Sequence, residues 1–398
     1  MILNQTGSSF SDFLSQSIDT FWGFTGFANC EWGNIVMLLV GMFFIWLAIK
    51  KDFEPLLLVP IGFGMLIGNI PFQEGMEIGI YEEGSVLNIL YNGVRYGWYP
   101  PLIFLGIGAM TDFSSLLANP KLMIIGACAQ FGIFGAYMVA LAIGFEPLEA
   151  GAIAIIGGAD GPTAIFLTSK LAPEMLGAIA VSAYSYMALV PVIIPLVVRL
   201  LCSEKELRIN MKEQDKLYPD ALQIKNMRVL KIIFPIAVTT IVAIFVPTAV
   251  SLVGMLMFGN LVKEIGNDTS RLFDAASNGV MNAATIFLGL CVGATMTVDA
   301  FINVQTLGIV AGGFCAFAFS IASGIFMAKA WNLFAKKKVN PLIGATGLSA
   351  VPMASRVCNT ISTKYDPKNH VLNYCMSSNI SGVIGSAVAA GVLISFLG

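Results

Sequence analysis

Six long stretches of the chain contain almost no charged residue, and this feature limits the possible fold more than any other. They are Gly33–Ile49, Leu122–Phe145, Met175–Val198, Val229–Val246, Thr306–Met327 and Val371–Leu397. Each is close to or longer than the roughly 17–25 residues that a helix needs to cross about 30 Å of hydrocarbon. Charged residues make up only 12% of the chain, whereas soluble proteins average about 25%. The sequence therefore predicts an all-α polytopic membrane protein.

Charge and cysteine content argue against nucleic-acid binding and against a cysteine metal site. The net charge is −2 and there is a single histidine, so the chain lacks the basic patch that binds nucleic acid. We expect no nucleic-acid partner. The seven cysteines show no CxxC pair, and we expect them to pack as small apolar residues.

The N-terminal residues 1–30 differ from the apolar stretches because they mix aromatic and polar side chains. Phe10, Phe13, Ile18, Phe21 and Trp22 recur at helical spacing among Ser, Gln and Asp. This pattern is typical of a helix that lies in the plane of the membrane interface. The alternative, a disordered tail, does not explain so many aromatic residues.

Three motifs of the first half return in the second half in the same order. Their pairs are Met65–Asn69 with Leu256–Asn260, Ile103–Phe113 with Ile286–Asp299, and Ile156–Gly161 with Ile343–Gly347. Internal repeats of this kind underlie many transporter folds. We predict a first repeat over residues 31–202, a connecting loop over 203–228 and a second repeat over 229–398.

Loop charge predicts that the second repeat is inverted. The connecting region Ser203–Lys231 contains seven Lys and Arg residues, which assigns it to the cytoplasm and the N-terminus to the outside. Equivalent loops of the two repeats then differ: one carries Glu146 and Glu149, and the other carries Lys329 and Lys336 to Lys338. Opposite charge at equivalent loops is what an inverted-topology repeat predicts.

One apolar segment of each half cannot form a continuous helix. In Gly151–Lys170 the sequence Gly157-Gly158-Ala159-Asp160-Gly161-Pro162 interrupts it, since Gly and Pro disfavour a helix interior. Unwound backbone at membrane depth occurs only where it is buried in protein or lines a cavity. Its free carbonyl oxygens suit a hard cation such as Na⁺. We therefore predict broken, re-entrant helices with a cation site.

Asp160 has two interpretations. It precedes a first-turn proline, which is a good position for a helix N-cap. However, a carboxylate inside a membrane segment costs roughly 2.5–3.5 kcal/mol, which favours a functional role. The two roles can coexist.

The second broken segment, Asn340–Arg356, carries no acid. Pro341, Gly344, Gly347 and Pro352 interrupt it, and Asn340, Thr346 and Ser349 offer neutral oxygens. Arg356 follows, either as an end-of-helix cation that reaches the interface or as a clamp for a carboxylate, which its planar fork suits.

Four further polar residues lie near these segments. Tyr186 and Asn379 are on the long helices that close each half, where hydrogen bonding between helices and function are equally good explanations. Asp112 and Asp299 end the short segments of the repeat, and we expect both to cap helices.

Four runs of sequence resemble one known family. They are GGADGPT (157–163), SAYSYMALVP (182–191), NPLIGATGLSAVPMASR (340–356) and NISGVIGSAVAAGV (379–392). These runs, in this order, are similar to the β subunit of the sodium-pumping biotin-dependent decarboxylases, which act on oxaloacetate, glutaconyl-CoA, methylmalonyl-CoA or malonate. The resemblance extends over essentially the whole chain.

The resemblance implies a primary sodium pump in the bacterial cytoplasmic (inner) membrane. A separate biotin carrier, loaded by a carboxyltransferase subunit, would deliver carboxybiotin; its decarboxylation would consume a proton and drive Na⁺ outward. It also implies a small single-span γ-type subunit and a homo-oligomer within a hetero-oligomeric complex. We expect the chain to have neither a biotinyl-lysine motif nor a soluble domain able to hold acyl-CoA, so the carboxylic substrate would be determined by another polypeptide.

The same resemblance implies roles for individual residues. Asp160 and Asn379 correspond to residues that contribute to Na⁺ binding, and Tyr186 to a residue of coupling or proton supply. Asn340, Gly344, Ser349 and Arg356 match the rest of the pattern. We expect the first three in the Na⁺ site and Arg356 at the carboxylate of carboxybiotin.

One rival function fits the residues alone equally well, and a second does not. A sodium-coupled secondary transporter of carboxylates, without chemistry, would show the same repeats and broken helices. A purely structural membrane scaffold would leave Asp160 unexplained.

Overall fold

The computed structural model describes residues 10–51, 55–72, 78–218, 226–301, 304–350 and 353–398, and these residues form helices and no strand. Seven helical stretches are long and apolar enough to cross a membrane: Trp32–Lys50, Pro120–Ile143, Met227–Phe245, Pro247–Ile265, Asn267–Ala294, Thr306–Phe334 and Leu372–Leu397. A bent pair, Pro173–Tyr186 with Leu189–Leu201, would make an eighth. The predicted all-α, multi-spanning architecture is confirmed.

The chain packs as two compact units that do not follow the two halves of the sequence. The smaller unit combines Met1–Asn92 with Gly289–Ile302. Its helices are α1 (Phe10–Phe24), α2 (Trp32–Lys51), α3 (Pro55–Gly68), most of α4 (Val86–Arg95), α18 (Val298–Phe301) and the end of α17 (Met281–Ala294). The predicted N-terminal helix is present as α1, with Phe13, Phe21 and Trp22 exposed. Its position at a membrane interface stays a prediction.

Within this unit α3 and α17 cross with their backbones in contact. A Cβ added to Gly64 would lie 2.2 Å from the carbonyl oxygen of Leu290, so only glycine permits the crossing. Beyond the end of α3, the Asn69 side-chain amide donates to the Met296 carbonyl oxygen at 2.7 Å. The side chain of Asp299, predicted to cap a helix, lies outside the described residues.

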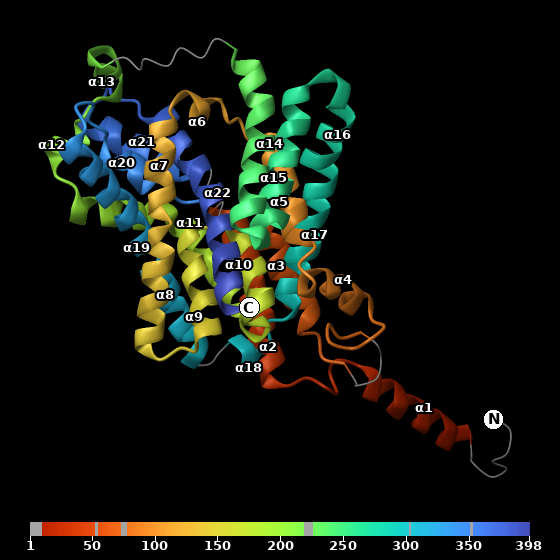
Figure 1. Cartoon of the computed structure of the whole chain (residues 1–398). Helices are drawn as coiled ribbons and strands as arrows, with labels where there is room; N and C mark the ends of the chain where they lie inside the picture. The colour runs from red at the N-terminus through yellow and green to blue at the C-terminus, as the bar shows by residue number, and fades with distance from the viewer. Residues whose placement is uncertain (1–9, 52–54, 73–77, 219–225, 302–303, 351–352) are drawn as a thin grey trace. The chain divides into compact units, whose positions relative to one another are not determined.

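The larger unit combines Gly93–Leu288 with Asn303–Gly398 (Figure 1). Up to the basic loop its elements are the end of α4 (Val86–Arg95), α5 (Tyr99–Met110), α6 (Ser114–Ala118), α7 (Pro120–Ala129), α8 (Phe131–Ile143), α9 (Pro147–Ala154), the 3₁₀ turn η1 (Ile155–Gly158), α10 (Gly161–Leu171), η2 (Pro173–Met175) and α11 (Leu176–Leu201).

After α11 come α12 (Glu204–Leu207), α13 (Met211–Leu217), α14 (Met227–Phe245), η3 (Pro247–Ala249), α15 (Val250–Ile265), η4 (Asn267–Thr269), α16 (Ser270–Asp274), the π-helical turn η5 (Ala275–Val280), α17, α19 (Val304–Phe334), α20 (Pro341–Ala345), α21 (Met353–Tyr365) and α22 (Leu372–Leu397). Two long helices, α19 and α22, hold this unit together. α19 packs on α7, α8, α11 and α20, and α22 packs on α7, α10 and α21.

Helix α11 bends by 67° between Tyr186 and Leu189. Pro191 lies one turn further on, and its ring collides with the carbonyl group four residues earlier while supplying no N–H. The bend is therefore explained by the proline. It lies next to Tyr186, a predicted site residue.

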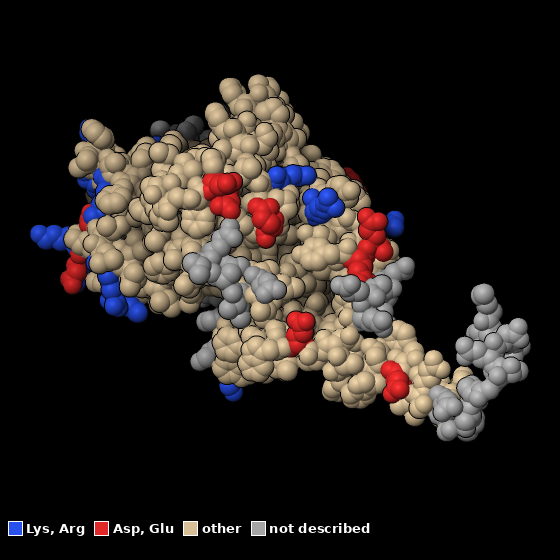
Figure 2. Space-filling view, turned by 90° about the horizontal axis from the view of Figure 1, so that it is seen from below, with Lys and Arg blue, Asp and Glu red and all other residues tan. Residues whose placement is uncertain are grey.

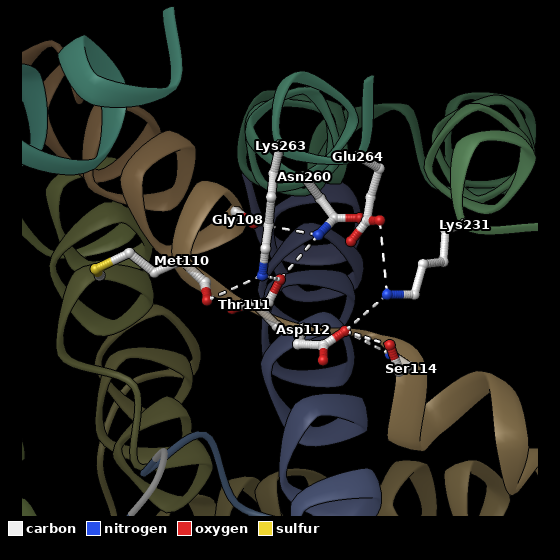
Figure 3. Close-up of polar contacts among 9 residues, drawn as sticks. All are labelled: Gly108, Met110, Thr111, Asp112, Ser114, Lys231, Asn260, Lys263 and Glu264. Atoms are coloured by element: carbon white, nitrogen blue, oxygen red, sulfur yellow. Dashed lines mark hydrogen bonds and ion pairs between the residues drawn. The ribbon is translucent and has the colours of Figure 1, made fainter. Parts of the chain in front are cut away.

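Helix α5 ends in a polar cluster against α14 and α15 (Figure 3). Asn260 donates to the Gly108 and Thr111 carbonyl oxygens at 3.3 and 3.0 Å, which satisfies the last turn of α5. Asp112 accepts from the Ser114 backbone N–H at 3.0 Å and pairs with Lys231 at 3.3 Å. Burial raises the pKa of Asp112, but these hydrogen bonds and Lys231 outweigh it and hold the pKa below its usual value.

Figure 2 shows the structure from below the view of Figure 1. Most of the surface seen there is uncharged, and charged side chains occupy only a few places on it. Large apolar side chains such as Phe131, Met138 and Ile143 are more than half exposed, as expected for helices whose outer faces contact lipid rather than water.

All seven cysteines are free.

Candidate functional site

The first broken segment is a helix that stops and restarts around Asp160. Helix α9 tightens into η1 and ends at Ala159, whose φ of 52° makes it the one non-glycine residue with a positive φ among the described residues. This left-handed conformation costs an L-residue roughly 1–2 kcal/mol. The backbone leaves the helix there: Asp160 is extended, and α10 starts at Gly161-Pro162.

The Asp160 carboxylate is buried and held by three groups. One oxygen accepts the backbone N–H of Thr163 at 3.1 Å, so Asp160 is the N-cap of α10. The other accepts the hydroxyls of Ser349 at 2.9 Å and Ser386 at 2.7 Å. The predicted cap is confirmed, and the carboxylate also joins three distant parts of the chain.

The second broken segment meets the first directly. The Ser349 backbone N–H donates to the Gly158 carbonyl oxygen at 2.9 Å. On α22, the Asn379 amide donates to the carbonyl oxygens of Thr346, Leu348 and Ala350 at 3.2, 2.7 and 3.4 Å. Carbonyl groups that lose their helical hydrogen bonds where α20 ends therefore accept hydrogen bonds from one side chain, Asn379. Ser349 and Asn379 therefore lie at the same junction as Asp160.

Asn340 and Gly344 shape this second segment but are not among the hydrogen-bond partners of the Asp160 carboxylate in the described chain. The Asn340 side-chain oxygen accepts the Leu342 N–H at 3.0 Å as the N-cap of α20, and its amide donates to Leu207 and Ile209 at 2.9 and 3.0 Å. Gly344 lies against α19, where a Cβ would be 2.0 Å from the Gly324 carbonyl oxygen.

Tyr186 and Arg356 make no hydrogen bond to Asp160. The Tyr186 hydroxyl donates to the Val310 carbonyl oxygen on α19, so it has the hydrogen bond between helices that the sequence allowed. Arg356 is exposed near the start of α21, and its guanidinium has no hydrogen bond or ion pair with any described residue. The roles predicted for both residues stay predictions.

Two residues at the junction were not predicted from the sequence. Ser386 lies seven residues after Asn379, which puts both on one face of α22; that spacing was an available signal. Gln130 is an isolated amide within the apolar stretch Leu122–Phe145. Its amide donates to the Gly347 carbonyl oxygen at 2.7 Å, and its buried oxygen faces the region of Gly158.

The junction offers oxygen ligands and one negative charge. The side-chain oxygens of Gln130 and Asn379 are buried and have no hydrogen-bond donor among the described residues. Among the described residues, no group of three or more His, Cys, Asp or Glu side chains could hold a metal ion. One carboxylate with neutral hydroxyl and amide oxygens suits a hard monovalent cation rather than a transition metal.

Comparison with known proteins identifies the family that this chain resembles along almost its whole length. Residues 33–397 match the model of the family described as Na⁺-transporting oxaloacetate decarboxylase beta subunit. The chain is 49% identical to the methylmalonyl-CoA decarboxylase subunit beta of Propionigenium modestum, over 97% of this chain and 100% of that protein. It is 45% identical to the glutaconyl-CoA decarboxylase subunit beta of Acidaminococcus fermentans, over 94% and 96%. It is 44% identical to the oxaloacetate decarboxylase beta chain 2 of Salmonella typhi, over 92% and 95%.

Proposed function

This chain belongs to the β-subunit family of the Na⁺-transporting decarboxylases of the bacterial inner membrane, and we propose that Asp160 is the site at which it exchanges Na⁺ for a proton. One observation carries the proposal: the buried Asp160 carboxylate lies where the two broken segments meet, and Ser349 and Ser386 hold it. A single buried negative charge is neutralised equally by Na⁺ or by H⁺, so the two ions compete for it.

The residues around Asp160 would bind Na⁺ as transported substrate. The hydroxyls of Ser349 and Ser386 now donate to the carboxylate, and each can turn a lone pair toward a cation instead. The buried amide oxygens of Gln130 and Asn379 lack donors and supply two further candidate ligands. We infer a site built from both segments, α22 and the junction of α7 with α8.

Arg356 fits the carboxylate of carboxybiotin. Its guanidinium is exposed and has no partner among the described residues, and a free planar fork binds a carboxylate with two hydrogen bonds. Carboxybiotin, carried on a separate subunit, would supply the carboxyl group whose release as CO₂ consumes a proton. Arg356 would hold that anion, and Asp160 would hold the proton or the Na⁺ that it replaces.

Helix α21 supplies a route between Arg356 and the cytoplasm. It follows the break beside Asp160, and its thirteen residues span about 20 Å. After its end, Asp366 accepts a hydrogen bond from Asn210 of the basic connecting region. Thr360 and Lys364 are exposed one and two turns beyond Arg356. Polar side chains on one face of a helix at membrane depth imply water rather than lipid there.

We further propose that the two halves are inverted repeats, and paired helix crossings support this. In one unit α3 crosses α17, and Asn69 after α3 caps the Met296 carbonyl. In the other unit α15, the repeat counterpart of α3, crosses α5, the counterpart of α17, and Asn260 caps the Thr111 carbonyl. Asn69 and Asn260 are equivalent in the predicted repeat. Each crossing thus pairs a helix of one half with a helix of the other half, as expected if a two-fold axis relates the two halves.

The β-subunit family implies other subunits. We propose that the biotin carrier and carboxyltransferase act from the cytoplasm, beside a single-span γ-type subunit and further copies of this chain. Export of Na⁺ against 100 mV requires about 2.3 kcal/mol per charge. Because relatives act on three different substrates, we infer that the substrate is selected elsewhere in the complex.

Replacing Asp160 by Asn tests the exchange site. The asparagine amide keeps the shape of the side chain but carries no negative charge to attract Na⁺. Na⁺-dependent decarboxylation by the complex should therefore be abolished. Asp112→Asn is the matched control, because Asp112 is paired with Lys231 outside the junction and should retain Na⁺ activation. Near-normal Na⁺ activation of the Asp160 variant would refute the site.

Avidin separates the pump from the secondary transporter. If carboxybiotin drives transport, avidin added on the carrier side should stop ²²Na⁺ uptake into inside-out vesicles that contain the complex. Uptake that continues with avidin present would favour coupling to a carboxylate gradient instead. Family membership already favours the decarboxylase.

A further inference from the structure

One face of α21 carries a row of polar and basic side chains. Arg356, Thr360 and Lys364 are exposed and follow one another at intervals of four residues, so they lie on the same face of the helix. From Arg356 to Lys364 this face extends about 12 Å along the axis. Lys368, in the turn after α21, and Arg208, at the end of α12, are exposed as well. Together these five residues form the α21 surface.

The carboxylate of Asp366 brings the two outermost cations together. It accepts the Lys368 backbone N–H and the Asn210 side-chain amide, both at 3.0 Å. These two hydrogen bonds, with the positive charges of Lys368 and Arg208, hold the pKa of Asp366 below its usual value. Arg208 of the connecting region therefore lies at the same end of the α21 surface as Lys368.

The basic side chains of the α21 surface keep their charge available for a partner. None of the four forms an ion pair with a described residue. Asp366 offsets one of the four charges, so the surface remains positive. The complementary partner carries acidic side chains.

Water rather than lipid faces the α21 surface. Among the described residues 353–371, which form α21 and the turn after it, no large hydrophobic side chain is exposed. The spanning helix α14, by contrast, exposes Ile233 and Phe245. Hydrogen bonds from the connecting region to Asp366, and from Asn369 to that region, place the end of α21 on the cytoplasmic side. A cytoplasmic protein can therefore reach this surface.

The helix that follows the first break has no comparable open face. In α10 all residues from Gly161 to Ser169 are buried, and so is Leu171. In α21 the buried residues are Ala354, Ser355, Cys358, Ile361 and Ser362. No described part of the chain covers the face of α21 that carries Arg356, so this face is open to a partner.

From these observations we propose that the α21 surface is the docking site of the biotin carrier, which binds it through acidic side chains. The inference rests on the proposed function, in which carboxybiotin reaches Arg356 from the cytoplasm. Lys364, Lys368 and Arg208 bind the carrier protein, and Arg356 receives the carboxylate of its biotin. The two lysines are positioning residues that do not touch carboxybiotin. Complementary charge also accelerates the association of the two proteins.

The test measures association between the full-length chain in nanodiscs and the purified carrier subunit without biotin. At low KCl, Lys364→Gln/Lys368→Gln should lower the association rate constant about fivefold, since each exposed ionic contact contributes a factor of about two. The difference should disappear near 1 M KCl, where the screening length is about 3 Å. Lys364→Arg/Lys368→Arg should associate normally. Arg228→Gln/Lys336→Gln is the matched control, because both side chains are exposed outside the α21 surface.

Steady-state kinetics separate docking from the chemistry at Arg356. With the carboxylated carrier, Lys364→Gln/Lys368→Gln should raise KM about fivefold and leave kcat unchanged. With free N-carboxybiotin, which needs no docking, this variant should react normally, whereas Arg356→Gln should lose activity with both substrates. Normal activity of Arg356→Gln on free N-carboxybiotin would refute the role of Arg356 and leave the docking result standing.

Three results would overturn the docking site. Normal association of Lys364→Gln/Lys368→Gln at low KCl would show that the carrier binds elsewhere. An equal loss in the control variant would show a general attraction to the basic cytoplasmic face. Reduced retention of phosphatidylglycerol in native mass spectrometry, with normal carrier binding, would assign the surface to lipid headgroups. The association assay uses carrier without biotin, so its outcome does not depend on decarboxylation or Na⁺ transport.

Discussion

The two broken segments have the same design but different chemistry. Each starts at a capped N-terminus with a first-turn proline, loses its helix at glycines, and resumes as a second helix. The first is sealed and contains the buried acid Asp160 and the strained Ala159. The second has no acid in its break, and its resumed helix carries the exposed cation Arg356. In the function proposed above, the first segment would bind the transported Na⁺ and the second would bind carboxybiotin.

The largest effect is expected where the second segment is packed most closely. In Gly344→Ala the new Cβ would be 2.0 Å from the Gly324 carbonyl oxygen, a contact that no side-chain movement relieves. We expect loss of most folded protein, measured by size-exclusion yield and thermal unfolding. Gly135→Ala in α8, which has nothing within 4 Å of the new Cβ, should fold normally. Equal yields would show that α19 and α20 are free to separate.

The next largest effect is expected at Arg356, and it tests whether this residue binds carboxybiotin or Na⁺. Arg356→Gln removes the proposed carboxylate clamp and should lower kcat/KM for the carboxylated carrier about 30- to 150-fold, since charge-assisted bonds contribute about 2–3 kcal/mol. Arg356→Lys should recover part of this loss. The Na⁺ concentration for half-maximal activity should change less than twofold. A large change in Na⁺ dependence with normal turnover would instead place Arg356 in the ion site.

The hydroxyls that bind Asp160 should have smaller and similar effects. Ser349→Ala and Ser386→Ala each remove one hydrogen bond to the same oxygen. At about 1–1.5 kcal/mol each, either should raise the Na⁺ requirement about five- to tenfold, measured by the Na⁺ dependence of decarboxylation. Ser395→Ala on α22, where the hydroxyl bonds to Gly391 and Thr248, is the control. If only Ser349→Ala changes the Na⁺ requirement, α22 is not part of the site.

The smallest effects are expected at the two N-caps. Asn340→Ala removes the cap of α20 and two bonds to the connecting region, and should destabilise the chain by about 1–2 kcal/mol. Glu149→Gln leaves a capping box at α9 intact, because Gln also suits that position, and should change stability by less than about 0.5 kcal/mol. Thermal unfolding in one detergent checks both. A larger loss at Glu149 would mean that its charge, rather than its hydrogen bond, holds the first segment.

The sequence predicted the spanning helices, both breaks and the cap at Asp160, because these depend on local features: apolar length, glycine, proline and the residue before Gly161-Pro162. The partners of Asp160 were harder to predict. Ser349 was expected from the family pattern, but Ser386 and Gln130 come from helices that reach the junction only through packing. Gln130 had no motif around it. The two packing units were also not predicted, since the smaller one joins the N-terminal helices to the end of α17 and α18 from the second half.

Helix α22 has a mechanical consequence that its separate hydrogen bonds do not reveal. Asn379 donates hydrogen bonds to the second break, and Ser386 donates one to Asp160 in the first break. The two residues lie on the same face of α22, seven residues or about 10 Å apart along its axis. A turn of this one rod would release both breaks together. Rotating it by a single residue position, 100°, would withdraw both side chains together. If Asp160 is the proposed Na⁺ site, this one movement would open that site and free the carbonyl oxygens bound by Asn379 at the same time.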